Sequence, residues 1–374
     1  MNNKFNLSIA LSTLLLGSAQ ASTIYDKDGT SLDAFGKIDV MALSDSAARS
    51  IKSATNKKSN DATIQNAVHF GIAGRTKVNN SLYAIAASEW LMPTGNNGVD
   101  NIKTRAQYVG LDAQQYGTLT FGRGDNAFYT VAGVTDIFNQ LDSNVNDHYA
   151  FGDYQPALAM YSLSSMGWDF RISYQTAADN VNDTDISIHN GAAFSFATRL
   201  DNGIGIAYGM SYYYLKHDDN HQIANYYQGQ TQKMYPFAKN DFFIQGLRPT
   251  WKTDKGVSIS YGTFGDGLYA ALNFTQTKYN KFTHYLYSYE AVVNYAFENG
   301  FALTSGFGIK RFNGANIIED LTIGAYYNFT PNFKVFVEAC FDISSKPEHY
   351  YTKSQIKDMN LTRNKALIGA EYAY

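Results

Sequence analysis

Apolar and polar residues alternate with a period of two along much of the chain, most clearly in its last third. Residues 333–342 are an example, with Phe333, Val335, Val337, Ala339 and Phe341 on one side and Lys334, Phe336, Glu338, Cys340 and Asp342 on the other. Successive side chains of a β-strand point to opposite faces. The pattern therefore predicts strands with one apolar face and one polar or small face.

Sixteen such strands are predicted along the chain. Their ranges are 34–44, 64–76, 82–91, 104–113, 118–123, 157–164, 168–177, 190–200, 204–214, 256–264, 268–278, 286–297, 301–311, 319–329, 333–343 and 364–374. Most have about ten residues, the length of a tilted strand that crosses a bilayer. An even number of strands is typical of bacterial membrane barrels.

Two further features favour a membrane barrel over a soluble β-sandwich, which would alternate in the same way. Aromatic residues concentrate at the ends of the apolar faces, as at Tyr212, Phe329 and Tyr372, where bilayer interfaces favour them. We also expect short turns, such as 201–203, to alternate strictly with long polar loops. At sixteen strands a barrel encloses water rather than a packed core.

The N-terminus predicts export. Residues 1–21 contain Lys4, an apolar run over 9–16 and the Ala19-Gln20-Ala21 cleavage pattern of a signal peptide. Residues 22–374 then form the mature chain, in which no run approaches the ~18 apolar residues of a membrane helix. An exported chain without such a helix is either soluble or a transmembrane β-barrel.

Composition excludes several function classes. The chain of 374 residues has 30 Lys+Arg against 33 Asp+Glu, so its net charge of −3 gives no attraction for nucleic acid. The single cysteine, Cys340, excludes a disulfide framework and a Cys-rich zinc site. The seven histidines have no metal-ligand spacing. We expect no enzymatic activity, no cofactor and no metal.

Four segments carry a resemblance to a known family: 24–37 (IYDKDGTSLDAFGK), 108–123 (YVGLDAQQYGTLTFGR), 133–136 (GVTD) and the terminal strand 367–374 (LIGAEYAY). With them the chain resembles the trimeric general porins of Gram-negative outer membranes, over essentially its full mature length. That family usually ends in Phe, so Tyr374 is a mild departure from its pattern.

The resemblance implies both fold and function. It implies an all-β, 16-stranded antiparallel transmembrane β-barrel with an inward-folded third loop, here residues 124–156. It also implies a homotrimer in the outer membrane of a Gram-negative bacterium, in contact with lipid and lipopolysaccharide. Such a channel would let small hydrophilic solutes and ions diffuse passively through a water-filled lumen. The loop itself mixes apolar residues such as Phe128 and Phe138 with carboxylates, which a solvated external loop has less reason to do.

In the family, acids on this loop face bases on the opposite wall and create a field across the constriction. Matched position by position, the resemblance assigns the pore constriction to Lys37, His69, Glu89, Arg105, Arg123, Asp136 and Gln140. Two of these depart from the family, because His69 replaces an arginine and Gln140 an acid. Tyr154 stands at a further basic position. An imidazole of ordinary pKa is mostly neutral at pH 7, so we expect a weak transverse field and weak ion selectivity of undetermined sign.

Two alternatives stay open. One is a channel that prefers a substrate such as a sugar, for which an aromatic track could include Tyr269, Tyr326 and Phe336, all predicted to point inward. The other is a receptor or adhesin barrel with a plugged lumen.

Overall fold

The computed structural model describes residues 21–45, 62–94, 102–141, 145–146, 148, 154–179, 181, 187–216, 250–280, 284–346 and 364–374. Their elements are β1 (Ser22–Lys27), β2 (Thr30–Asp45), β3 (Ala62–Asn79), β4 (Leu82–Thr94), β5 (Lys103–Asp112), η1 (Gln114–Tyr116), β6 (Thr118–Gly124), α3 (Tyr129–Ala132), β7 (Gln155–Ser165), β8 (Trp168–Gln175), β9 (Ile188–Arg199), β10 (Ile204–Leu215), β11 (Trp251–Thr263), β12 (Asp266–Tyr279), β13 (Leu286–Ala296), β14 (Phe301–Phe312), β15 (Ala315–Thr330), β16 (Phe333–Asp342) and β17 (Lys365–Ala373).

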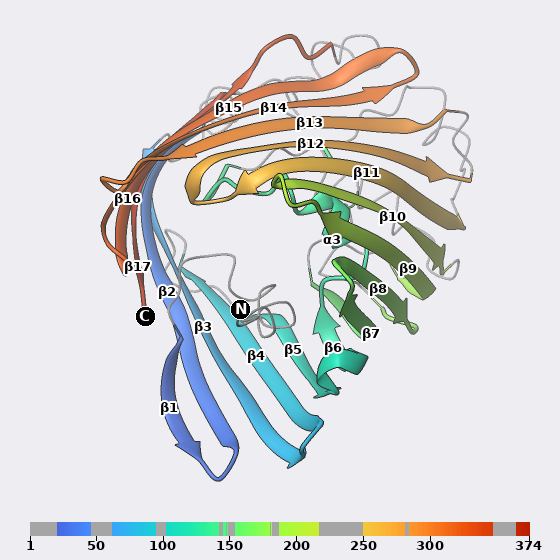
Figure 1. Ribbon diagram of the computed structural model, residues 1–374. Helices are drawn as coiled ribbons and strands as arrows, with labels where there is room; N and C mark the ends of the chain where they lie inside the picture. The colour runs from blue at the N-terminus through green and yellow to red at the C-terminus, as the bar shows by residue number, and fades with distance from the viewer. Residues whose placement is uncertain are drawn as a thin grey trace.

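The strands form one sheet that closes into a barrel (Figure 1). Each strand from β2 to β17 pairs with its sequence neighbour, and β17 pairs antiparallel with β2. β1 pairs with residues 30–34 of β2, while β17 pairs with residues 37–45 of the same strand, so the two share one position in the wall. The sixteen predicted strands correspond one to one with β2 to β17, and the predicted barrel is confirmed.

The last residue completes the closure of the barrel. The Gly36 N–H donates to the Tyr374 carbonyl oxygen at 3.1 Å, and the Tyr374 N–H donates to the Gly36 carbonyl oxygen at 3.0 Å. A Cβ at position 36 would lie 2.3 Å from the His69 carbonyl oxygen and 2.7 Å from the Tyr374 hydroxyl. Only glycine allows this close approach of the two backbones.

The two faces of the wall divide as the alternation predicts. In β16, Phe333, Val337 and Phe341 are exposed on the outside, whereas the intervening Phe336 and Glu338 are buried on the inside. Aromatic rings gather at both ends of the outer face. The rings of Phe297 and Tyr295 lie 4.6 Å apart at the end with the short turns, and Tyr212 stacks on Trp251 at 6.3 Å at the other end. Such rows match the two interfaces of a bilayer.

The expected strict alternation of short and long connections is wrong at one place. β14 and β15 are joined by the two-residue turn Asn313–Gly314, at the barrel end where the other connections are longer. Both residues have positive φ, 45° and 83°, as a type I′ turn requires, and Asn-Gly is its strongest sequence signal. The hairpin therefore keeps its pairing out to Phe312 and Ala315.

Some predictions fall outside the described residues. The signal peptide, 1–21, lies almost entirely there and stays a prediction. The predicted strands 204–214 and 256–264 leave a long connection between them. It is shorter in the structure, because β11 begins at Trp251, and residues 217–249 are outside the described part. None of the helices among the described residues is long and apolar enough to cross a bilayer.

Candidate functional site

The connection between β6 and β7 folds into the barrel. It spans 125–154, slightly less than the predicted 124–156, and is called the third loop below. Its first part forms the single helical turn α3, which lies against the inner side of β9 to β12 (Figure 1). The predicted inward fold of this loop is confirmed.

Two apolar contacts fix the first half of the third loop to the wall. Phe128 and Ala132 are fully buried and pack with Ala193 of β9 and Met160 of β7. The wall makes room for them with a glycine, since a Cβ at Gly256 would lie 3.0 Å from the Phe128 ring. The burial of a whole phenylalanine side chain contributes about 1.5–3 kcal/mol.

The second half of the third loop is fixed in the same way. Phe138 packs on Tyr269, Ala271 and Val292 of β12 and β13. Further on, Leu141 packs in a cluster with Phe336, Cys340 and Leu367, on β16 and β17. The apolar residues of the loop are therefore anchors that reach from β9 around to β17.

Polar bonds hold the backbone of the loop between these anchors. The Asn273 Nδ2 donates to the Val131 carbonyl oxygen at 2.5 Å, and the Tyr269 hydroxyl donates to the Val134 carbonyl oxygen at 2.7 Å. The Thr135 hydroxyl donates to Glu290 Oε2 at 2.9 Å. Each bond runs between the loop and β12 or β13, so the backbone of the loop is held at a defined position along these strands.

The tip of the third loop is bound by a single carboxylate from β16. Glu338 accepts the backbone N–H groups of Asn139, Gln140 and Leu141 at 2.6, 3.0 and 2.8 Å. It also accepts the Tyr326 hydroxyl at 2.7 Å. Glu338 is fully buried, and four donors satisfy a charge that would otherwise be costly to bury.

Lys37, the first predicted basic residue, lies between two carboxylates of its own wall. Its Nζ is 2.8 Å from Glu371 Oε2 and 3.2 Å from Asp39 Oδ2. Lys334 approaches the other oxygen of Glu371 at 2.9 Å and donates to Asn139 Oδ1 of the loop tip at 2.9 Å. This chain of contacts links the wall to the residue next to Gln140.

His69, Glu89 and Arg105 form a second group beside the first. Lys37 and His69 are direct partners across β2 and β3. His69 Nδ1 lies 3.3 Å from Glu89 Oε1, which is 3.1 Å from Arg105 Nε. The Arg105 guanidinium also donates to the Tyr154 hydroxyl at 2.8 Å. Burial raises the pKa of Tyr154 above its ordinary value, although the charge of Arg105 opposes this, so the phenol is a neutral partner.

The remaining three predicted residues differ in their placement. Arg123 joins the second group through its Nε, which donates to the Arg105 carbonyl oxygen at 3.0 Å. Asp136 is exposed on the third loop and accepts the Tyr129 hydroxyl at 3.1 Å. Burial, together with the nearby Asp136, raises the pKa of Tyr129 well above its ordinary value. Gln140 is bound through its backbone N–H to Glu338.

The structure thus brings five of the seven predicted residues together on the wall and leaves two on the loop. It also adds acids that the residue-by-residue match missed, namely Asp39 and Glu371, both buried beside Lys37. They occupy inward positions of predicted strands, and a count of inward carboxylates would have found them. Because Lys37, His69 and Arg105 each have a carboxylate neighbour, this part of the wall carries charges of both signs and is not a uniformly basic surface.

No group of three or more His, Cys, Asp or Glu side chains that could hold a metal occurs among the residues that the structure describes. Cys340 is a buried thiol beneath the loop tip.

A closed sixteen-stranded barrel with an apolar outer face, a charged inner face and a loop bound inside it defines a transmembrane channel protein of the porin class. A family model described as Gram-negative porin matches residues 8–344. The chain belongs to this family, and its location is the outer membrane of a Gram-negative bacterium.

The chain is similar to several curated porins over almost its whole length. It is 25% identical to the outer membrane porin PhoE of Salmonella typhimurium over 358 residues, which cover 90% of this chain and 92% of that protein. It is 24% identical to the outer membrane porin N of Escherichia coli over 395 residues, 95% of this chain and 96% of that protein.

Solved structures show the same fold. OmpF of Salmonella typhi, in complex with daunomycin, aligns with a TM-score of 0.71 at 18% identity and covers 94% of this chain and 100% of its own. A trimer form of OmpT from Vibrio cholerae aligns with a TM-score of 0.57 at 12% identity, covering 93% of this chain and 100% of its own.

Proposed function

We propose that this porin is a non-specific channel through which small hydrophilic solutes and ions diffuse passively. The observation that carries the proposal is the binding of the third loop along the inner wall, from Phe128 on β9 to Glu338 on β16. A loop held in this way narrows a lumen at a fixed place. Family and fold are those of a channel rather than of an enzyme, and we propose that no reaction is catalysed.

We further propose that Lys37, His69, Glu89, Arg105, Arg123, Asp136 and Gln140 form the constriction, and that its ion selectivity is weak. The support is the pairing on the wall, where Lys37 is neutralised by Asp39 and Glu371, and Arg105 by Glu89. Paired charges at about 3 Å act at a distance as dipoles, which steer ions much less than single charges do.

Tyr269, Tyr326 and Phe336, the three residues considered for a sugar-binding aromatic track, have a different role. Tyr269 and Phe336 point inward as predicted, but both are buried under the third loop, against Phe138 and Leu141. Tyr326 donates its hydroxyl to Glu338 and stacks on Phe336 at 6.4 Å. These rings support the loop, so they give no argument for a sugar-binding track.

Single-channel conductance of the purified protein in planar bilayers tests the proposal, together with liposome swelling over a size series of neutral sugars. We expect ohmic conductance, swelling that falls steadily with solute size, and a reversal potential near zero in a KCl gradient. Sealed bilayers would contradict a channel and favour a plugged receptor barrel. A strong preference for K⁺ or Cl⁻ would contradict weak selectivity alone.

We also propose that the chain assembles as a homotrimer through the outer face of β2 to β5, and that lipid and lipopolysaccharide contact the rest. On the outer side of these strands Gly36 and Gly74 have no side chain and Ala86 has only a methyl group, which would let a neighbouring subunit approach closely. Gln107 of β5 is exposed on the same outer face, which would contact lipid in a monomer. A polar amide facing hydrocarbon is unfavourable, so protein is its expected neighbour. The trimeric form of OmpT gives a precedent in a protein of the same fold.

The oligomeric state of two matched variants tests this surface. Ala86→Trp replaces the methyl group on the proposed interface with a large ring and should convert trimers to monomers in unheated electrophoresis. Ile259→Trp makes the same change on the outer face of β11, where Ile259 is exposed, and should leave the oligomer intact. Equal behaviour of the two variants would contradict the proposed interface.

A further inference from the structure

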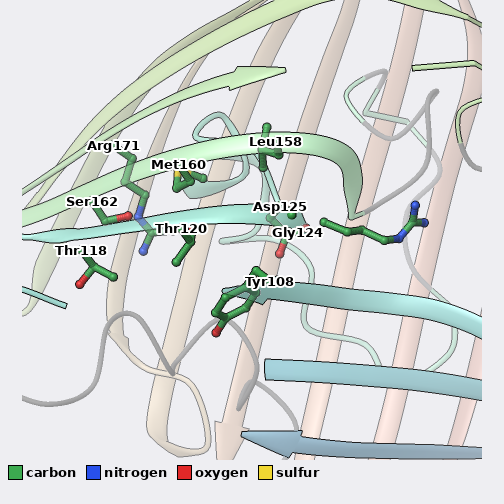
Figure 2. Close-up of a pocket in the computed structure, with 11 residues that line it drawn as sticks. Tyr108, Thr118, Thr120, Gly124, Asp125, Leu158, Met160, Ser162 and Arg171 are labelled. Carbon is green, nitrogen blue, oxygen red and sulfur yellow. The ribbon is translucent and has the colours of Figure 1, made fainter. Parts of the chain in front are cut away.

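A hollow whose lining shares only Arg123 with the proposed constriction lies on the inner wall between β5 and β8, at the start of the third loop. Its lining includes Tyr108, Thr118, Thr120, Ser162 and Arg171, with Asp125 of the loop (Figure 2). It holds about 70 Å³ of space for water centres, several times the ~10–15 Å³ that one water molecule needs. It can therefore hold part of a solute.

Two cations line this hollow, Arg123 and Arg171. Arg123 donates its Nε to the Arg105 carbonyl oxygen at 3.0 Å. Arg171 is half-buried on the inner face of β8, and among the described residues none forms a hydrogen bond with its buried Nε. The acidic groups that act on it are Asp169, which is already bonded to the Ser164 hydroxyl, and Asp125. A guanidinium with an unused donor in a partly dry site is a receptor for an oxyanion.

The strand register places hydroxyl groups on both sides of Arg171. Ser162 of β7 is its direct partner on one side, and Thr118 of β6 is the partner of Ser162. On the other side Ser195 of β9 is its direct partner, with a buried hydroxyl that has no bond within the described residues. Hydroxyls both donate and accept, so this row suits a ligand with several hydroxyl groups of its own.

Asp125 and Tyr108 complete the chemistry of the hollow. Figure 2 shows Asp125 at the side of the hollow away from Arg171, with Tyr108 below it. A carboxylate there repels a second negative charge but accepts hydrogen bonds from solute hydroxyls. The tyrosine ring offers an apolar face of the kind on which the C–H face of a sugar ring packs.

We propose that this hollow is a solute-binding subsite for sugar acids, with the carboxylate on Arg171 and the hydroxyls on Thr118, Thr120, Ser162 and Asp125. The Arg171 fork can bind a carboxylate through two hydrogen bonds. The proposal rests on the chain being an open channel, and it adds a preference within that function. A solute that binds there transiently occupies part of the lumen beside the wall and so reduces the ion current.

The test measures the ion current through reconstituted protein while D-glucuronate is added. We expect a saturable reduction of conductance by glucuronate. Two solutes of similar size should act at least about tenfold more weakly: neutral D-glucose, and cyclohexanecarboxylate, an anion without hydroxyls. Equal effects of glucuronate and either comparison solute would overturn the assignment to sugar acids.

Two charge-removing variants then locate the site. Arg171→Gln should weaken the glucuronate effect at least about tenfold, the loss of a charge-assisted hydrogen bond. Arg199→Gln removes an equal charge from the exposed end of β9, outside the hollow, and should change the effect less than twofold. Equal weakening by both variants, or by neither, overturns the site.

The conductance of each protein in KCl without added solute separates the two proposals. If none of the proteins conducts, the porin function itself fails. If all conduct normally but glucuronate has no saturable effect, only the subsite fails. The same measurement shows that each variant has folded and inserted.

Discussion

Glu338 is the residue whose replacement tests the description of the third loop most directly. Its carboxylate accepts three consecutive backbone N–H groups and the Tyr326 hydroxyl. Glu338→Gln keeps the shape but replaces one oxygen with an NH₂ group, which then faces N–H donors instead of accepting from them. Whichever oxygen is lost, two of the four bonds go with it.

The size of the effect follows from those bonds. A hydrogen bond to a charged group contributes about 1.5–3 kcal/mol, and because bonds to one carboxylate are not additive, we take about 3 kcal/mol for the loss of two. Since 1.4 kcal/mol is a factor of ten, the population with a detached tip rises roughly 150-fold. A tip that is free for about 0.1% of the time would then be free for roughly a tenth of it.

Single-channel recording shows such a change as excess current noise or discrete steps, because the tip moves in and out of the current path. We expect these fluctuations in Glu338→Gln and, more weakly, in Tyr326→Phe, which removes one of the four donors. Glu298→Gln makes the same chemical change at an exposed turn and should be as quiet as the unaltered protein. Indistinguishable recordings from Glu338→Gln and Glu298→Gln would refute the role of Glu338 as the anchor of the tip.

Three further outcomes are expected. His69→Arg adds a positive charge to the lumen. A unit charge ~10 Å from an ion in water contributes about 0.4 kcal/mol, which is about twofold for each ion and of opposite sign for Cl⁻ and K⁺, so the Cl⁻ to K⁺ permeability ratio should rise about fourfold. A reversal potential that moves toward K⁺ would contradict the sign. Phe128→Ala should destabilise the protein by about 3–5 kcal/mol because the ring is fully buried. The lipid-facing control Phe121→Ala should cost much less, and heat-induced unfolding followed by electrophoretic mobility compares the two. Gly306→Val places a side chain where even a Cβ lies 2.7 Å from the Phe138 ring; we expect a displaced loop, an altered conductance and a loss of about 1–3 kcal/mol, and an unchanged conductance would show that Phe138 does not position the loop.

The sequence alone determined the barrel. Membrane strands need an apolar outer face and a polar inner face, so each of the sixteen strands carries its own period-two signal, and all sixteen were found within a few residues. The errors came where that signal is absent or weak. β1 lies outside the alternating pattern because it is exposed along its whole length, and the Asn313–Gly314 turn was overlooked among residues that continue the hairpin.

The candidate site depended more on tertiary structure. Alternation shows that Lys37 and Lys334 point inward, but not that they share Glu371 from the terminal strand. That contact exists because closure of the barrel brings β17 against β2, which are separated by more than 300 residues. The same applies to Glu338, whose three donors come from a loop about 200 residues earlier in the chain.

The local pattern of apolar and polar residues thus determines which residues face lipid and which face the lumen, because every membrane strand needs an apolar outer face and a polar inner face of its own. Only the closed barrel decides which lumen charges neutralise each other and where the third loop is held. Those contacts join residues that are far apart in the sequence and become neighbours only through the order of the strands around the wall.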